Sequence, residues 1–430
     1  MIRDNEDNNN VENIDNPEEQ DIQDDGVENL EEQTDQPEEG LQQAEVQQTD
    51  EELADEIMVA KTRKIEDEAY EVASQFKLMW WKFRKHRLAT IAGPILIVLF
   101  LIAIFADVLA PVAPLRRYTE HPHAPPATVR FRGHDGFSIR PFVYRTEMHR
   151  DPWTFRRIYV ENVNYRYYLQ FFSPGERYYL WGMIPMERRL IGLDGVDYTE
   201  FNLFIAGTDS LGRDLFSRLI HGTRISLSFG LVSVFFTLLI GLTLGGIAGY
   251  VGGVVDNLIM RIIEVLQCIP HIPLWMALAA ALPRHWGPLQ VYLGMVLIMS
   301  LIGWAGLARA TRGYILSTRE EDFVMAARLS GSGHWYIIRK HLLPSFMSFI
   351  IVHLTLSIPG SILGETALSF LGLGLQPPVI SWGVLLIESQ TLQTLAHHPW
   401  LLLPAAPVVI TVLMFNFLGD GMRDAADPYK

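Results

Sequence analysis

Residues 318–344 have the side-chain types and spacing of a segment that docks on another molecule. Thr318 or Ser317 can cap a helix, and three carboxylates in its first turn suit the helix dipole. Small apolar residues follow on one face, and a glycine can end the helix. The residues concerned are Glu320, Glu321, Asp322, Phe323, Ala326, Ala327, Gly331 and Gly333. The pattern predicts a short helix that enters a groove on another protein, with an ordinary interfacial helix as the alternative.

Spacings typical of catalytic and cofactor sites are absent from the sequence. It contains no Gly-Lys pair, and hence no phosphate-binding P-loop, no His-Glu-x-x-His and no Gly-x-Ser-x-Gly. Four histidines beside prolines lack the spacing of metal ligands: His121, His123, His397 and His398. The single cysteine, Cys268, excludes a disulfide scaffold and a cysteine-based zinc cluster. We therefore expect no catalysis, no cofactor and no metal, so uphill transport would need an ion gradient or a partner ATPase.

The charge is divided unevenly along the chain. Residues 1–60 hold 22 acidic residues and one basic residue, Arg3, whereas residues 61–430 hold 27 acidic and 34 basic residues. The net charge of −14 is thus an average over a tail of −21 and a body of +7. Such a tail buries too little apolar surface to fold, so we expect disorder and either a solvated linker or a docking arm. No basic stripe with interleaved aromatics indicates nucleic-acid binding.

Six apolar stretches are long enough, or nearly so, to cross about 30 Å of hydrocarbon. They cover residues 88–110, 225–250, 258–282, 289–310, 346–371 and 400–418. Arg261, Glu264 and Pro270 interrupt the third stretch. Gly241, Gly245 and Gly249 in the second stretch share one helix face, which predicts close helix approach for plain packing or for a sliding interface.

The basic residues predict that both termini are cytoplasmic. Five lie just before the first stretch, where residues 61–87 predict a helix along the membrane surface. Six more lie between Arg309, at the end of the fourth stretch, and Lys340, before the fifth. The loops at 283–288 and 372–399 contain only Arg284 between them.

Residues 111–206 form a hydrophilic insert with 19 aromatic residues, 13 arginines and no lysine. Residues 129–132 and 138–145 predict one β-hairpin, and residues 165–172 and 177–181, separated by Pro174-Gly175, predict a second. We expect a small β-containing domain outside the membrane. Its aromatic residues would be either its core or a protein-contact surface.

Five ordered blocks resemble the inner-membrane permease subunit of dipeptide/oligopeptide-type ABC importers. They cover residues 207–214 (Gly-Thr-Asp-Ser-Leu-Gly-Arg-Asp), 217–227, the loop 318–344, 369–378 and 418–428. The resemblance implies an all-α polytopic membrane protein with six transmembrane helices of the type I ABC importer permease kind. Composition and resemblance together divide the chain into the disordered tail 1–60, the juxtamembrane helix 61–87, the first transmembrane helix 88–110, the extracytoplasmic insert 111–206, and a five-helix core 207–430 with a cytoplasmic coupling loop 311–344. The tail and the long insert depart from the family pattern.

The resemblance also implies which residues are functional. Those coupling the chain to an ATPase would be Asp322, Phe323, Met325, Ala326, Ala327, Arg328, Gly331, Ile338, Leu343 and Pro344. Met325 replaces the glutamate of the family's Glu-Ala-Ala pattern, which removes any carboxylate contact there. The family motif at the outer face comprises Gly207, Thr208, Asp209, Gly212, Arg213 and Asp214. Glu365 and Asn416 are candidates for the pathway, with a helix-packing hydrogen bond as the alternative for Glu365.

The partners implied are a second permease forming a heterodimer, two ATP-binding subunits, an extracytoplasmic solute-binding protein and the bilayer of a bacterial cytoplasmic (inner) membrane. The function implied is ATP-driven import of peptides or similar small solutes. A gradient-driven carrier or channel is the alternative. It should show paired intramembrane charges and inverted repeats, and the sequence has few such charges and no evident repeat.

Overall fold

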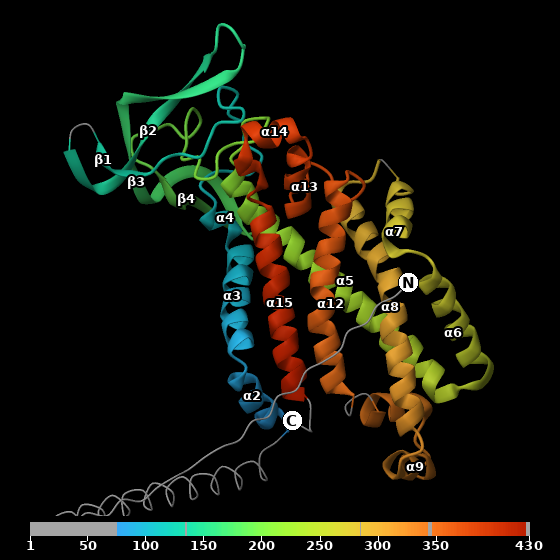
Figure 1. Ribbon diagram of the computed structural model, residues 1–430. Helices are drawn as coiled ribbons and strands as arrows, with labels where there is room; N and C mark the ends of the chain where they lie inside the picture. Colours follow the sequence, from blue (N-terminus) through green and yellow to red (C-terminus); the bar gives the residue numbers. More distant parts are fainter. Residues whose placement is uncertain (1–74, 134–135, 284, 343–345, 427–430) are drawn as a thin grey trace, which may run out of the picture. The chain divides into compact units, whose positions relative to one another are not determined.

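The computed structural model describes residues 75–133, 136–283, 285–342 and 346–426 (Figure 1). The acidic tail 1–60 and residues 61–74 of the expected juxtamembrane helix lie outside the described residues, as do Leu343 and Pro344. The rest of that expected helix forms α2 (Gln75–Lys85).

Within the described residues, five helical segments are long and apolar enough to cross a membrane. They are α3 (Arg87–Ile104), α5 (Leu215–Val251), α8 (Pro288–Thr318), α12 (Met347–Phe370) and the span Pro399–Ala425, which joins η3 (Pro399–Leu402) to α15 (Ala405–Ala426). A sixth span results if the bent pair α6 (Gly253–Cys268) and α7 (His271–Ala280) is counted as one.

The bend of 91° between α6 and α7 corrects the single stretch expected over 258–282. The helix breaks at Ile269, which is extended, and Pro270. Proline has no backbone N–H to donate, and its ring disfavours helical geometry at the residue before it. The break therefore lies at the residue pair where proline prevents a continuous helix.

The close approach predicted from the three glycines is confirmed along α5 and α8, which pack side by side. A Cβ atom at Gly241 would lie 2.9 Å from the Leu307 side chain. At Gly245 it would lie 2.5 Å from the Ala308 carbonyl oxygen, and at Gly249 2.8 Å from that of Arg312. Only hydrogen fits at these positions, so the backbones of the two helices come almost into contact.

The insert contains a four-stranded antiparallel sheet in the order β1-β2-β3-β4 (Figure 1). Its strands are β1 (Arg130–Gly133), β2 (Gly136–Arg150), β3 (Arg157–Leu180) and β4 (Ile184–Leu193). The first predicted hairpin is confirmed as β1 and β2. The second is wrong, because residues 165–172 and 177–180 lie in one strand, β3. An irregularity in the β3–β4 register, between Pro174 and Tyr178, accommodates Pro174-Gly175 without a chain reversal.

The aromatic residues of the insert are partly buried and partly exposed. Tyr118, Phe201 and Phe204 are buried in its core with four aliphatic residues. Others are largely exposed, including Phe137, Trp153, Phe155, Phe171 and Phe172. The core alone therefore does not account for the aromatic content.

The sheet is attached to the helices through the short α4 (Ala106–Leu109) and the end of α3. The indole Nε1 of Trp181 donates to the Ile104 carbonyl at 2.9 Å. Arg189, buried on β4, donates through Nη1 to the carbonyls of Asp107 at 3.2 Å and Ala110 at 2.9 Å. We call this end of the helices the sheet end, and the opposite end, where α5 and α8 terminate, the α9 end.

Short helices complete the two ends. At the sheet end they are α13 (Trp382–Leu386), η2 (Ile387–Ser389) and α14 (Leu392–His397). At the α9 end they are α9 (Asp322–Leu329), α10 (His334–Ile337) and the π-helical turn η1 (Ile338–Leu342).

Candidate functional site

The helix expected in the loop 318–344 is α9, but its start differs from the prediction. The capping role expected of Thr318 or Ser317 is wrong, because α8 continues to Thr318 and both hydroxyls donate to the Tyr314 carbonyl at 2.8 Å. The first residue of α9 is Asp322, so Glu320 and Glu321 precede the helix. Its end agrees with the prediction, since Gly331 takes a φ of +77° just beyond it.

One face of α9 is anchored to the ends of α5 and α8. Val324 is fully buried in a cluster with Tyr250 of α5 and Ile315 of α8. Ile337, Ile338 and Leu342 complete this cluster. The guanidinium of Arg328 lies over the Tyr250 ring at 4.9 Å, and its Nε donates to the Tyr250 hydroxyl at 3.1 Å. A displacement of α9 would therefore act directly on both long helices.

The other face of α9 exposes large apolar side chains. Leu329 is 86% exposed, and Phe323 and Met325 are each more than 40% exposed. Ala326 is also exposed, and Ala327 is half-buried. Trp335 and Tyr336 on α10 extend this apolar surface. An exposed apolar surface on so short a helix is typical of a protein-contact site.

The motif 207–214 at the sheet end has the opposite character, because its charges are buried. Asp209 is 1% exposed and accepts hydrogen bonds from the backbone N–H groups of Leu211 and Arg213, each at 2.9 Å. Its carboxylate also pairs with Arg213 Nε at 2.6 Å and with Arg218 Nη1. Burying three charges is favourable only where they are paired in this way.

The remaining motif residues tie three segments together. Thr208 Oγ1 accepts from the Ala124 N–H at 2.7 Å, and the Thr208 carbonyl accepts from Trp400 Nε1 at 3.2 Å. Asp214 caps α5 by accepting from the Ser217 N–H at 2.7 Å. Burial raises the pKa of the Asp214 carboxyl to about 6. A side chain at Gly212, whose φ is +70°, would clash with the Tyr118 carbonyl oxygen.

Glu388 completes this site, and nothing in its sequence context indicated it. It accepts from the backbone N–H and the hydroxyl of Ser210, both at 2.9 Å, and lies 3.7 Å from Arg213 Nη2. Arg218 was equally missed as a partner of Asp209, although it lies in one of the sequence blocks. We call Asp209, Arg213, Arg218 and Glu388 the charged node.

Glu365 of α12 is fully buried near the sheet end, and its hydrogen bonds lie within the chain. Its Oε1 accepts from the Ser369 hydroxyl at 2.8 Å and from that of Ser381, which caps α13, at 2.7 Å. The Trp382 N–H, next along the chain, donates to Ser226 Oγ of α5 at 3.1 Å. This geometry agrees with the helix-packing alternative for Glu365. Asn416 lies half-buried on α15.

The predicted residues thus fall into separate sites. The motif precedes α5 and the α9 anchor adjoins its last turn, so the 37 residues of α5 hold them roughly 55 Å apart. Within the described ranges, no group of three or more His, Cys, Asp or Glu side chains could hold a metal ion.

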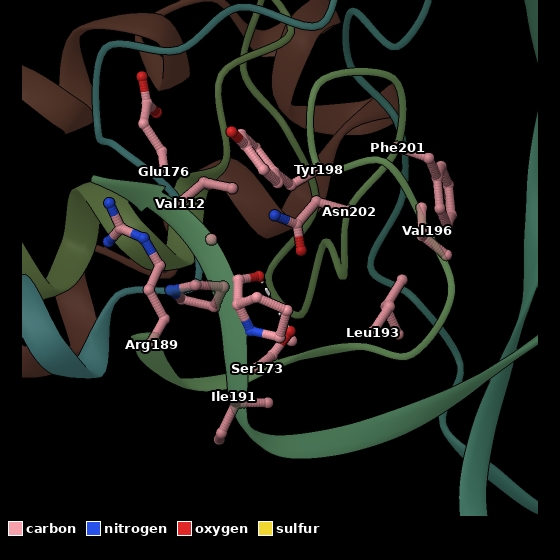
Figure 2. Close-up of a pocket in the computed structure, with 14 residues that line it drawn as sticks. Val112, Ser173, Glu176, Arg189, Ile191, Leu193, Val196, Tyr198, Phe201 and Asn202 are labelled. Atoms are coloured by element: carbon pink, nitrogen blue, oxygen red, sulfur yellow. Dashed lines mark hydrogen bonds between the residues drawn. The ribbon is translucent and has the colours of Figure 1, made fainter. Parts of the chain in front are cut away.

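The cavity inside the insert is too small for a solute. Figure 2 shows Ser173, Arg189 and Asn202 among the side chains around it. Its free volume is about 20 Å³, enough for a single water molecule. The insert core is therefore structural.

Comparison with known proteins decides the family. The family model described as binding-protein-dependent transport system inner membrane component matches residues 241–429, and the one for the N-terminal TM domain of oligopeptide transport permease C matches residues 74–126. The dipeptide transport system permease protein DppC of Bacillus subtilis (strain 168) is 44% identical over 225 residues, covering 52% of this chain and 68% of that protein. The chain belongs to this family of transport permeases.

Other members of this permease family match at similar levels. The glutathione transport system permease protein GsiD of Pectobacterium atrosepticum is 41% identical, covering 52% of this chain and 71% of that protein. The oligopeptide transport system permease protein OppC of Haemophilus influenzae is 42% identical, with coverages of 52% and 69%.

A solved structure of the MetNI methionine ABC transporter, in an inward-facing conformation, covers 50% of this chain and 98% of its own at 20% identity. The TM-score of this match is 0.40. The permease is a multi-pass membrane transport subunit and not an enzyme. Its sheet, residues 130–193, falls between the two segments that the family models match.

Proposed function

We propose that this permease is the transmembrane subunit of an ATP-driven importer for peptides or similar small solutes. The dipeptide, glutathione and oligopeptide permeases among its relatives support this substrate class. In this proposal it forms the pathway with a second, different permease, and a solute-binding protein delivers the solute. Two ATP-binding subunits drive the cycle through the helix in residues 318–333.

The geometry of α9 is the observation that carries this proposal. Its buried face, at Val324, rests on α5 and α8, while its opposite face presents Phe323, Met325 and Leu329 to solvent. The exposed face enters a groove on an ATP-binding subunit. Closure of the two ATPases moves α9, and the contacts of Val324 and Arg328 transmit that motion to α5 and α8.

Each of the coupling residues has a place in this scheme. Met325, exposed where the family has a glutamate, fills an apolar groove instead of forming an ion pair, because its unbranched thioether adapts to irregular surfaces. Asp322, Ala326 and Ala327 complete the docking helix. Gly331, with its positive φ, permits the turn that follows the docking helix. Ile338 belongs to the buried cluster that anchors α9 to α5 and α8. Leu343 and Pro344, outside the described residues, join the loop to the fifth of six spans.

We further propose the orientation and the division of the chain. The α9 end faces the cytoplasm, together with both termini, and the sheet end faces outward from a bacterial inner membrane. The cytoplasmic tail (1–60), surface helix (61–87), first span (88–110), outer insert (111–206) and permease core (207–430) are the functional parts. The charged node holds the outer ends of the spans in place, and Glu365 and Asn416 are candidates to line the pathway of this type I permease.

The test is uptake in proteoliposomes that contain this permease, its partner permease, the ATP-binding subunits and the solute-binding protein. Met325→Arg on the exposed face of α9 should lower ATP-driven uptake of a labelled dipeptide at least tenfold, because it places a charge in an apolar groove. Met183→Arg, the matched control in the exposed β3–β4 turn, should leave uptake within twofold.

Two outcomes would contradict the proposal. Unchanged uptake by Met325→Arg would show that α9 is not the coupling element. Uptake by this permease without any ATP-binding subunit would indicate a gradient-driven carrier instead.

A further inference from the structure

A cavity of about 600 Å³ lies between the β2–β3 turn of the insert and α14. Side chains from both segments line it, among them Arg156, Arg157, Tyr159, His397 and His398. It differs from the small cavity inside the insert because it is open to solvent and large enough to admit side chains of another molecule.

The cavity has an excess of fixed positive charge. Arg156 and Arg157 are exposed, and neither forms an ion pair with any described residue. One carboxylate, that of Asp151, also lines the cavity. Its Oδ1 already accepts from the Trp153 and Thr154 N–H groups, at 2.7 and 3.0 Å, which hold the pKa of Asp151 below its usual range. Two guanidinium groups thus remain available to a carboxylate ligand.

Histidines on the opposite wall supply further donors. The rings of His123 and His398 stack at 4.2 Å, and burial lowers the pKa of both, that of His398 to about 4. At neutral pH these rings are therefore uncharged and offer N–H groups. The buried Nδ1 of His398 has no hydrogen-bond partner within the described part of the chain.

Aromatic side chains extend the surface at the β2–β3 turn beyond the cavity. Trp153 is 90% exposed and Phe155, with a φ of +54°, is 76% exposed. The Asp151 carboxylate fixes the turn that presents them. Tryptophan beside arginine is the composition of interface hot spots, and a small solute held in the cavity would leave Trp153 and Phe155 uncovered. The arrangement suits a protein surface.

We propose that the cavity and the β2–β3 turn together form a docking site for an acidic surface of the solute-binding protein, with carboxylates at Arg156 and Arg157 and an apolar patch on Trp153 and Phe155. This inference rests on the proposed function, which supplies the solute-binding protein as partner. The two arginines of the cavity, unpaired within the described residues, and its exposed aromatic rim would be complemented by an acidic, partly apolar surface on that partner.

The docking site is connected to the permease core. His123 Nε2 lies 3.9 Å from Glu388 Oε2, and Glu388 binds Ser210 and Arg213 of the charged node. The node leads into α5, whose cap is Asp214. A partner seated on the cavity would therefore contact the segment that positions the outer end of α5.

The experiment uses the full chain in nanodiscs and two peptide probes, hexaglutamate and hexaglutamine. The wild type should bind hexaglutamate in a salt-sensitive manner and should not bind hexaglutamine. The double variant Arg156→Glu/Arg157→Glu should weaken hexaglutamate binding at least tenfold. Arg132→Glu, an exposed arginine on β1 that does not line the cavity, is the matched control and should change binding less than twofold.

A second arm measures the Kd of the solute-binding protein for the assembled importer, which should rise at least tenfold in the double variant and in Trp153→Ser. Equal effects of Arg132→Glu and the double variant would overturn the docking site. So would direct binding of a labelled dipeptide that the double variant abolishes while the Kd of the solute-binding protein is unchanged. An importer without ATP-driven uptake would refute the proposed function and leave the hexaglutamate result standing, so the two failures are distinguishable.

Discussion

At the sheet end of α5 the conspicuous side chains are charged, buried and paired, whereas at the α9 end they are apolar and exposed. Asp209 forms four hydrogen bonds in a site with almost no solvent access. Leu329 of α9 has most of its surface in water. Unpaired buried charge and exposed apolar surface are both unfavourable, but only the second can be relieved by a partner.

This contrast indicates different duties for the two ends. The charged node pairs its own charges, and its contacts join the insert, α5 and the segment after α13. The exposed face of α9 leaves apolar side chains in water that a partner could cover. Its buried face packs against α5 and α8, so a force applied to α9 would reach both helices. In the proposed function, the sheet end holds the helices in place and the α9 end receives the motion of the ATP-binding subunits.

The largest loss of stability is expected from a substitution of Asp209 in the charged node. Asp209→Ala would leave Arg213 and Arg218 buried without their shared carboxylate, so we expect a loss of about 3–5 kcal/mol in the free energy of unfolding. Asp194→Ala, which removes a half-exposed partner of Arg140, should cost about 0–1 kcal/mol. Thermal unfolding of the purified variants in detergent measures both. Similar losses in the two variants would show that the charged node is not a special source of rigidity.

A smaller loss of stability is expected from a substitution of Gly245, where α5 packs against α8 near the α9 end. Gly245→Ala would place a methyl group 2.5 Å from the Ala308 carbonyl oxygen and should cost about 1–3 kcal/mol by forcing the helices apart. Gly313→Ala adds the same methyl group where no atom lies within 4 Å, and should be neutral or stabilising by up to about 1 kcal/mol. The same unfolding assay compares them. A neutral Gly245→Ala would mean that rigidity at the α9 end does not depend on this backbone contact.

Acidification should loosen the sheet end selectively. Burial, together with nearby His123, His397 and Arg157, lowers the pKa of His398 to about 4, below its ordinary value of 6.5. The neutral ring thus contributes stability above pH 6.5, and this contribution is lost as the pH falls toward 4. Burial also lowers the pKa of His123, and the Glu388 carboxylate partly offsets that shift.

Between pH 7.5 and 5 we expect the apparent Tm of the wild type to fall relative to that of His398→Phe, which keeps an aromatic ring but cannot titrate. The raised pKa of Asp214 has the opposite effect on stability in this range, but it acts in both proteins. The comparison of apparent Tm across this range is the measurement. An identical pH dependence in the two proteins would exclude His398 as a source of the effect.

The smallest effect on stability should come from the exposed face of α9. Leu329→Ser removes apolar surface that is already in water, so we expect a change within about 0.5 kcal/mol. Val324→Ser on the buried face, which leaves a hydroxyl among apolar side chains, should cost about 1–3 kcal/mol. Thermal unfolding and ATP-driven uptake are measured together. Leu329→Ser should impair uptake without loss of stability, and a stability loss equal to that of Val324→Ser would contradict the two-faced arrangement.

Features that depend on neighbouring residues in the chain could be predicted from the sequence. Apolar length predicts spans because each helix satisfies its own backbone hydrogen bonds, and the four-residue glycine spacing predicts the face on which α5 meets α8. The hairpin of β1 and β2 follows from strand residues on both sides of a Gly-rich turn. The family resemblance, carried by five short blocks, led to the transport class that the comparisons support.

Other features depended on pairing between distant residues, and only the tertiary structure decided them. The same Pro-Gly pair that suggests a turn is tolerated inside β3 because β4 pairs around an irregularity there. Thr318 could equally start α9 or end α8, and packing selected the second. Glu388 lies 178 residues from Ser210, so no local pattern records their hydrogen bonds. The sequence by itself determined which segments are helical and apolar, while the structure decided which charges are buried together and which face of α9 is left for a partner, because both depend on contacts between segments far apart in the chain.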